Sequence, residues 1–189
     1  LFRSRIEAGT LMTAAAVTGG DITLCNVVPE HIKPVTAKLR ESGVEIIEKE
    51  SEIRVRSNRR PVSVDIKTHP FPGFPTDMQA PLSAYLCFAE GASVIVETIF
   101  ENRFMHVNEL KRMGAQIRLD GRTAIIEGIE EMQGAQVRAT DLRAGAALVI
   151  AGLGAKGTTE VLDIHHIDRG YEFIENKLQR LGADIKRVM

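Results

Sequence analysis

Three helix exits in this chain share one pattern, in which an amphipathic helix runs into a glycine and a strand follows. The glycines are Gly43, Gly114 and Gly182, which lie 71 and 68 residues apart. Glycine commonly stands just after the last turn of a helix, because its backbone adopts the left-handed conformation without steric cost. The regular spacing predicts that the chain contains three copies of one structural unit.

A second landmark repeats with nearly the same period. It consists of another helix that runs into glycine and a β-branched strand, at Gly20, Gly91 and Gly157, with spacings of 71 and 66 residues. Two landmarks that share one period argue against coincidence and support an internal threefold repeat.

The middle copy shows the complete unit. Its hydrophobic periodicities predict, in order, a strand, a helix, a strand, a helix and a two-stranded hairpin. The predicted elements are Val62–Ile66, Thr76–Glu90, Ala92–Ile99, Phe104–Met113, Ala115–Leu119 and Thr123–Glu127. The unit is therefore βαβαββ, and the predicted fold class is α/β with pseudo-threefold internal symmetry.

We expect a single domain over residues 1–189, made of repeats at about 1–58, 61–128 and 134–189. The first repeat opens directly with a helix over Glu7–Thr18 and lacks the leading strand. The third repeat ends after a strand over Ala183–Val188 and lacks the closing strand. Because the chain also begins without a methionine, we expect a longer parent protein whose upstream segment supplies these strands.

Composition narrows the function classes. The chain has 24 lysines and arginines against 25 aspartates and glutamates, so no net basic field favours nucleic acid. The longest uncharged apolar run, Ala144–Ala155, has 12 residues and is too short to span a bilayer. Without a signal peptide, a cytoplasmic location is expected. Cys25 and Cys87 lack metal-site spacing, and we predict buried thiols in a reducing compartment.

One glycine motif and the five histidines are predicted to be structural or surface features. Residues Gly152–Gly157 match the dinucleotide fingerprint G-x-G-x-x-G, but they follow a helix and precede a strand, whereas the fingerprint requires the reverse order. His165 and His166 are adjacent, so we expect their rings to point to different faces. No histidine pair has metal-ligand spacing, so no metal site is predicted.

The start of the helix after Pro75 is the first candidate site. Thr76 and Gln79 have the spacing of a capping box, which predicts that the helix begins there and places Asp77 in its first turn. A carboxylate in this position gains about 0.3–1 kcal/mol from the helix dipole, so a purely structural role for Asp77 is one interpretation. Pro81 removes the N–H that would bond to the Asp77 carbonyl, which is expected to loosen this turn.

Three arginines near helix starts form the second candidate site. Arg103 stands just before a predicted helix, and Arg143 and Arg169 are placed in first turns. A cation there opposes the helix dipole, whereas a guanidinium binds phosphate and carboxylate groups bidentately. The pattern therefore predicts an anion site where helix N-termini converge. The alternative is that each arginine pairs with a nearby acid, such as Asp141.

Four segments occur in order along the chain, namely Phe74–Ala80, Glu101–His106, Ala139–Ala144 and His166–Glu172. They resemble the signature segments of the UDP-N-acetylglucosamine 1-carboxyvinyltransferase family. The similarity extends from about Arg5 to Val188, which is nearly the whole chain.

The resemblance implies a transferase that moves the enolpyruvyl group of phosphoenolpyruvate to the 3′-hydroxyl of UDP-N-acetylglucosamine and releases phosphate. This is the first committed step of peptidoglycan precursor synthesis. The family has two similar domains, each an inside-out α/β barrel of three repeated units, with the active site in the cleft between them. The resemblance implies that this chain is the second domain, that its partner is the missing first domain of the same polypeptide, and that no cofactor is required.

The resemblance also assigns roles by position. Asp77 matches the aspartate that handles the proton of the sugar hydroxyl, and Ile99 matches a backbone contact to the nucleotide sugar. The positions around phosphoenolpyruvate match Arg103, Asp141, Arg143 and Arg169. The family's lysine–asparagine pair and reactive loop cysteine belong to segments that this chain does not contain, and neither Cys25 nor Cys87 matches that cysteine.

Two alternatives stay open. The isolated chain is expected to be a ligand-binding or folding module without turnover, because half of the cleft is missing. A different enolpyruvyl transferase, such as the shikimate-pathway enzyme, has the same architecture, although the aspartate and arginine segments here look unlike those of that enzyme.

Overall fold

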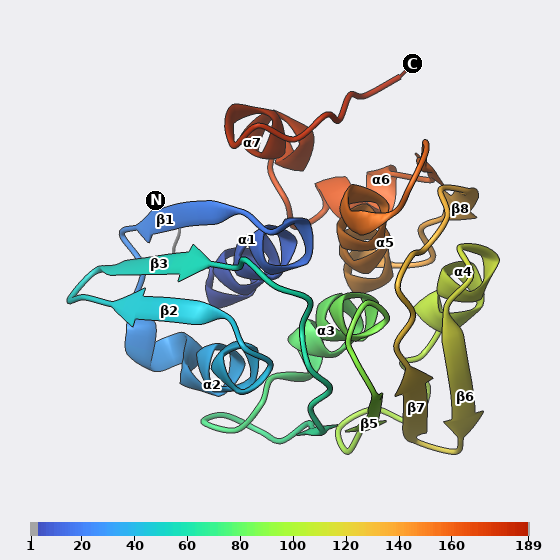
Figure 1. Cartoon of the computed structure of the whole chain (residues 1–189), viewed down its shortest axis with the longest axis horizontal. Helices are drawn as coiled ribbons and strands as arrows, with labels where there is room; N and C mark the ends of the chain where they lie inside the picture. The colour runs from blue at the N-terminus through green and yellow to red at the C-terminus, as the bar shows by residue number, and fades with distance from the viewer. Residues whose placement is uncertain (1–3, 189) are drawn as a thin grey trace.

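Three central helices organise the computed structural model, which describes residues 4–188 (Figure 1). They are α1 (Arg5–Thr18), α3 (Gln79–Leu86) and α5 (Leu142–Gly154). Each packs against the other two, and all eight residues of α3 are buried. A helix that is apolar on every side is stable only when protein surrounds it. The trio therefore forms the centre of the hydrophobic core.

Two of the three sheets belong to the first and third parts of the chain. The first sheet has the order β1 (Asp21–Cys25), β3 (Glu52–Arg56) and β2 (Glu45–Glu48), and all its pairings are antiparallel. The third sheet consists of β8 (Gln136–Arg138) and β9 (Glu160–Leu162), which run parallel. These sheets lie outside the central helices (Figure 1).

The second sheet, in the middle of the chain, has four strands. Its order is β4 (Ile66–Lys67), β5 (Ala92–Val96), β7 (Thr123–Glu127) and β6 (Gln116–Asp120). β4 and β5 are parallel, as expected for strands joined through a helix, and the other pairings are antiparallel.

Shorter helices connect the strands. They are η1 (Pro29–Ile32), α2 (Lys33–Glu41), η2 (Thr76–Met78), α4 (His106–Arg112), α6 (His165–Asp168) and α7 (Ile174–Arg180).

The three predicted helix exits have nearly identical backbone geometry. Gly43, Gly114 and Gly182 have φ angles of 99°, 96° and 97°. The residue after each glycine donates its N–H to the carbonyl of a leucine five positions earlier, at 3.0, 3.1 and 3.0 Å. These bonds satisfy carbonyls that the end of a helix leaves unpaired. The predicted helix ends are therefore confirmed at all three positions.

The repeat boundaries at about 1–58, 61–128 and 134–189 stay predictions, as do the strands expected from an upstream segment. Residues 1–3 of the first repeat and residue 189 of the third lie outside the described part of the chain. The first, middle and last thirds of the described chain each contain one central helix and one sheet.

The strand predicted over 183–188 is wrong, because these residues have no regular secondary structure. In the second sheet the equivalent strand, β6, pairs only with β7. The third sheet, within residues 4–188, contains only β8 and β9 and offers no counterpart of β7. A β-strand is stable through its ladder with a neighbour, so this segment stays irregular despite its alternating sequence.

The strand predicted over Val62–Ile66 is shorter than expected, since β4 covers only its last residue and the one after it. Side chains replace the ladder in the middle of this segment. The Val64 N–H donates to Ser93 Oγ at 3.1 Å, and Asp65 Oδ1 accepts from the Val94 N–H at 2.8 Å. These bonds keep the segment beside β5 without regular strand pairing.

Of the two cysteines, only Cys87 is buried, and burial raises the pKa of its thiol to about 12. The prediction for Cys25 is wrong: it ends β1 on the outward face of the sheet, one position after the buried Leu24. Residues Gly152–Gly157 form the end of α5 and the segment after it, before β9, so the expected order of helix before strand is confirmed. None of the helices within residues 4–188 is both long enough and apolar enough to cross a membrane.

Candidate functional site

Asp77 lies in the 3-10 turn η2, immediately before α3. The predicted capping box is wrong, because the Thr76 hydroxyl donates to Glu97 Oε2 at 2.8 Å and does not cap the helix. The Gln79 side chain is buried and finds no hydrogen-bond partner within the described residues. Pro81 offers no N–H to the Asp77 carbonyl, and the chain instead closes a tighter turn, from the N–H of Gln79 to the carbonyl of Thr76.

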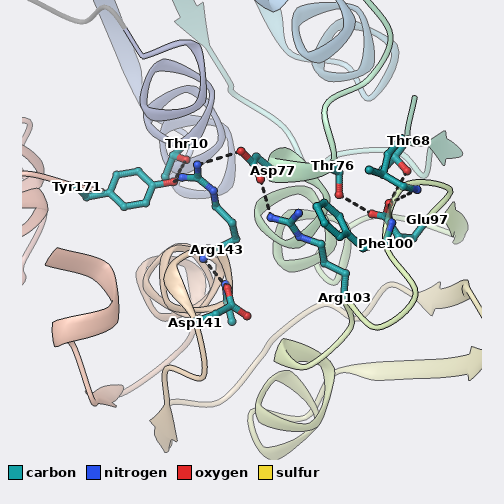
Figure 2. A network of polar contacts seen from close by, with 12 residues as sticks. Thr10, Thr68, Thr76, Asp77, Glu97, Phe100, Arg103, Asp141, Arg143 and Tyr171 are labelled. Carbon is teal, nitrogen blue, oxygen red and sulfur yellow. Dashed lines mark hydrogen bonds and ion pairs between the residues drawn. The ribbon is translucent and has the colours of Figure 1, made fainter. Parts of the chain in front are cut away.

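Two guanidinium groups from distant parts of the chain hold the Asp77 carboxylate (Figure 2). Arg103 Nη2 donates to Asp77 Oδ1 at 2.6 Å, and Arg143 Nη2 donates to Asp77 Oδ2 at 3.0 Å. Arg103 lies between β5 and α4, and Arg143 is the second residue of α5. The side chains of Asp77, Arg103 and Arg143 are 35%, 21% and 18% exposed, so solvent reaches the cluster.

The two arginines decide the charge of Asp77. Partial burial raises the pKa of its carboxyl, while the charges and hydrogen bonds of Arg143 and Arg103 lower it, and the net effect is a pKa below the usual 3.8. Asp77 is therefore ionised at neutral pH. It is a weak base while both guanidinium groups remain bound, because its proton affinity is reduced.

Aromatic side chains support both arginines, and sequence reasoning missed these contacts. Arg143 Nη1 donates to the hydroxyl of Tyr171 at 3.3 Å, and that hydroxyl shares a hydrogen bond of 2.8 Å with Thr10 of α1 (Figure 2). The guanidinium of Arg103 lies 4.6 Å from the ring centroid of Phe100. Tyr171 belongs to the signature segment His166–Glu172, and this position was the one sequence signal that could have marked it as a site residue.

Asp141 has a local role at the start of α5. Its Oδ1 accepts hydrogen bonds from the backbone N–H groups of Arg143 at 2.7 Å and Ala144 at 2.9 Å, which makes it the N-cap of the helix. The pairing of Asp141 with the arginine side chains, which was the alternative to an anion site, is not found. Arg103 and Arg143 do pair with an acid, but the acid is Asp77.

The side chain of Arg169 forms no hydrogen bond or ion pair with Asp77 or with the other residues described around it. It was predicted in the first turn of a helix after Asp168, but Asp168 is the last residue of α6 and Arg169 is its C-cap. Asp168 instead pairs with Arg187 at 2.6 Å. The Arg169 side chain is exposed, and among residues 4–188 it has no hydrogen bond or ion pair.

Ile99 is partly exposed in the loop after β5. Its backbone N–H donates to Glu97 Oε1 at 2.8 Å, so this group is already used inside the protein. The Ile99 carbonyl accepts no hydrogen bond from the described residues. If the backbone of this residue contacts a sugar, the carbonyl is therefore the group that is free to do so.

His106 is fully buried at the start of α4, and its Nε2 has no hydrogen-bond partner within residues 4–188. Burial lowers the pKa of His106 to about 4, with a further lowering by Arg103 and an opposing effect of Asp141. The side chain is therefore neutral at physiological pH. The expected divergence of His165 and His166 is wrong, because their ring centroids lie 4.1 Å apart.

Comparison with known proteins identifies the family. A family model described as EPSP synthase (3-phosphoshikimate 1-carboxyvinyltransferase) matches residues 4–178. The UDP-N-acetylglucosamine 1-carboxyvinyltransferase of Desulfofundulus thermocisternus is 59% identical over 184 residues, covering 97% of this chain and 76% of that protein. The chain belongs to the UDP-N-acetylglucosamine 1-carboxyvinyltransferase family. The predicted resemblance is confirmed.

Other relatives in this family are longer than the chain. The UDP-N-acetylglucosamine 1-carboxyvinyltransferase of Geobacter metallireducens is 58% identical over 184 residues, covering 97% of this chain but 44% of that protein. The chain thus spans less than half the length of that carboxyvinyltransferase.

Solved structures confirm the predicted fold class. The enolpyruvyl transferase NikO from Streptomyces tendae superimposes with a TM-score of 0.87 at 27% identity, covering 97% of this chain and 44% of that one. An EPSP synthase from Acinetobacter baumannii has a TM-score of 0.73 at 21% identity, a level at which only the fold is comparable. The architecture of the chain is therefore that of one part of an enolpyruvyl transferase.

His106 predicts an acid-sensitive component of stability. Because the folded state holds its pKa near 4 while the unfolded value is near 6.5, the unfolded state binds the proton first as pH falls. The free energy of unfolding should decrease by about 3 kcal/mol between pH 6.5 and 4, and stay reduced below that.

Denaturant unfolding at several pH values measures the free energy of unfolding of the parent chain and of His106→Leu. The decrease at acidic pH should be present in the parent and absent from His106→Leu. The exposed His69→Gln variant is the control and should follow the parent. Parallel pH profiles for the parent and His106→Leu would show that His106 is not buried in neutral form.

Proposed function

We propose that the protein containing this chain transfers an enolpyruvyl group from phosphoenolpyruvate to the 3′-hydroxyl of UDP-N-acetylglucosamine and releases phosphate. The observation that carries the proposal is the Asp77 carboxylate between Arg103 and Arg143, in a chain 59% identical to a UDP-N-acetylglucosamine 1-carboxyvinyltransferase. In this proposal the protein serves peptidoglycan precursor synthesis in the cytoplasm.

The reaction needs a base at the sugar hydroxyl and fixed positive charge around phosphate and carboxylate while a tetrahedral adduct forms and collapses. Asp77 supplies the base. Arg103 and Arg143 supply charge within contact distance of that base, at 2.6 and 3.0 Å. Arg169 supplies a third guanidinium, which has no partner among residues 4–188 and is available to a ligand.

Phosphoenolpyruvate activates the base in this mechanism by competing for its partners. Both Asp77 oxygens accept from a guanidinium, so neither is fully available to a hydroxyl proton. A phosphate or carboxylate that draws Arg143 or Arg103 toward itself removes the interactions that lower the Asp77 pKa. Binding of the anionic substrate then raises the proton affinity of Asp77 when the second substrate is in place.

The other candidate residues have supporting roles. Asp141 caps α5 and thereby fixes the backbone of Arg143, and the free carbonyl of Ile99 contacts the nucleotide sugar. The chain forms the second domain, and the first domain of the same polypeptide completes the cleft and supplies strands to the first and third sheets. The 44% coverage of a full-length relative supports this arrangement.

A second candidate function is that the chain, in isolation, is a ligand-binding module without turnover. It is favoured by the length comparison, since relatives such as the carboxyvinyltransferase of Geobacter metallireducens carry more than twice as many residues. Transfer to a phosphorylated shikimate is less well supported, because the relatives at 57–59% identity are named for UDP-N-acetylglucosamine. A phosphate-release assay of the isolated chain with both proposed substrates separates the module from the enzyme.

Asp77→Asn is the direct test of the base. In the full-length protein this change should lower kcat by two or more orders of magnitude, because the amide cannot accept the hydroxyl proton. Binding of UDP-N-acetylglucosamine, measured by calorimetry, should change less than threefold. The exposed Asp120→Asn variant is the matched control and should retain full turnover. Near-normal turnover of Asp77→Asn would show that Asp77 is not the base.

Arg169→Ala should separate the two substrates. The KM for phosphoenolpyruvate should rise at least tenfold in the full-length protein, since a guanidinium contact to phosphate or carboxylate is lost. The KM for UDP-N-acetylglucosamine should stay within threefold. Arg118→Ala, which also removes an exposed arginine without an ion pair in the described chain, should leave both values unchanged. Equal losses for both substrates would contradict the role.

A further inference from the structure

Glu97 is a buried carboxylate that accepts four hydrogen bonds. It follows β5 directly and is 1% exposed. Its Oε1 accepts from the Thr68 hydroxyl at 2.9 Å and from the backbone N–H groups of Ile99 at 2.8 Å and Phe100 at 3.2 Å. Its Oε2 accepts from the Thr76 hydroxyl at 2.8 Å (Figure 2).

Neutral donors alone satisfy this carboxylate, since Glu97 forms no ion pair within residues 4–188. A buried carboxylate is costly to desolvate unless hydrogen bonds meet its oxygens, and bonds to an ionised acceptor are short and directional. Replacing these bonds with apolar packing would bury the same volume without that cost. The hydrogen bonds of Glu97 are therefore better explained by the positions in which they hold the surrounding segments than by a contribution to the stability of the fold.

The four donors come from three segments that surround the candidate site. Thr76 is the residue before Asp77, and Ile99 is the proposed backbone contact to the sugar. The loop that Glu97 begins continues to Arg103, which pairs with Asp77. Thr68 stands directly after β4 and extends the network, since its hydroxyl also accepts the N–H of Thr98 at 2.8 Å.

We propose that Glu97 is a positioning residue for the transfer reaction. It fixes the position of the base Asp77 relative to the loop after β5, which contains the proposed sugar contact Ile99. It acts through Thr76, whose hydroxyl donates the hydrogen bond that joins the η2 turn to Glu97 at the end of β5. This inference rests on the proposed function, because it concerns the placement of the same base.

Thr76→Val tests the link, since it keeps the shape of the side chain and removes only the hydroxyl. Asp77 and its two arginines remain. In the full-length protein, kcat should fall about tenfold or more, because small errors in the placement of a reacting group are costly. The KM values for UDP-N-acetylglucosamine and phosphoenolpyruvate should stay within threefold, since no proposed binding contact is removed.

Two further variants separate positioning from general loss of structure. Thr76→Ser restores the hydroxyl and should return kcat to within threefold of the parent. Ser83→Ala removes a buried hydroxyl of α3 that, among residues 4–188, bonds only to the Gln79 carbonyl of its own helix, at 2.9 Å. It should leave kcat unchanged.

A double substitution shows whether the effect passes through Asp77. If it does, Thr76→Val should cause no further loss of kcat in the Asp77→Asn background. An independent, multiplicative loss in that background, a Thr76→Val kcat within threefold of the parent, or no recovery with Thr76→Ser would each overturn the inference while leaving the proposed function standing. Absence of turnover in the unmodified full-length protein would instead overturn the proposed function itself.

Discussion

The ion pairs between the Asp77 carboxylate and two guanidinium groups are the interaction on which the candidate site depends. They connect a 3-10 turn before α3, the loop before α4 and the first turn of α5, which are separated by many residues in the sequence. A partly exposed ion pair contributes little to stability by itself. Its importance here is chemical, because the same two arginines set the proton affinity of the aspartate and offer positive charge to an anion.

The threefold architecture explains why these groups meet. α1, α3 and α5 pack side by side in the core, and the starts of α3 and α5 come together where Asp77 meets Arg143. Thr10 of α1 completes the arrangement by holding Tyr171 against Arg143. The repeated unit thus brings equivalent helix ends together, although the residues at these ends differ from one copy to the next. The buried helices supply rigidity, and the loops at their ends supply the polar groups.

Local signals in the sequence predicted the features whose causes are local. The helix exits at Gly43, Gly114 and Gly182 were predictable because each depends on one left-handed residue and its neighbours. The positions of Arg103 and Arg143 at helix starts predicted an anion site, but not that Asp77 is the acid with which both pair. The capping box failed because the 3-10 turn η2 precedes α3, so that Met78 and not Thr76 is the N-cap of α3, and the Thr76 hydroxyl donates to Glu97.

Features that depend on distant partners were not predictable. The strand over 183–188 is absent because its ladder needs a neighbour that the described chain does not contain, and alternation of residues cannot show this. Arg169 was misplaced because α6 ends one residue earlier. Glu97 was overlooked, although one glutamate in the otherwise uncharged run Val94–Phe100 is a signal that a buried polar network needs it.

The protonation equilibrium of Asp77 tests the role of its two arginine partners most directly. Carboxyl carbon chemical shifts followed by NMR through an acid titration report the pKa of this group. The value should lie below the usual 3.8 in the parent protein and should rise in Arg143→Ala, since burial then acts with less opposition. A pKa at or above 3.8 in the parent, or one unchanged in Arg143→Ala, would show that the arginines do not control the base.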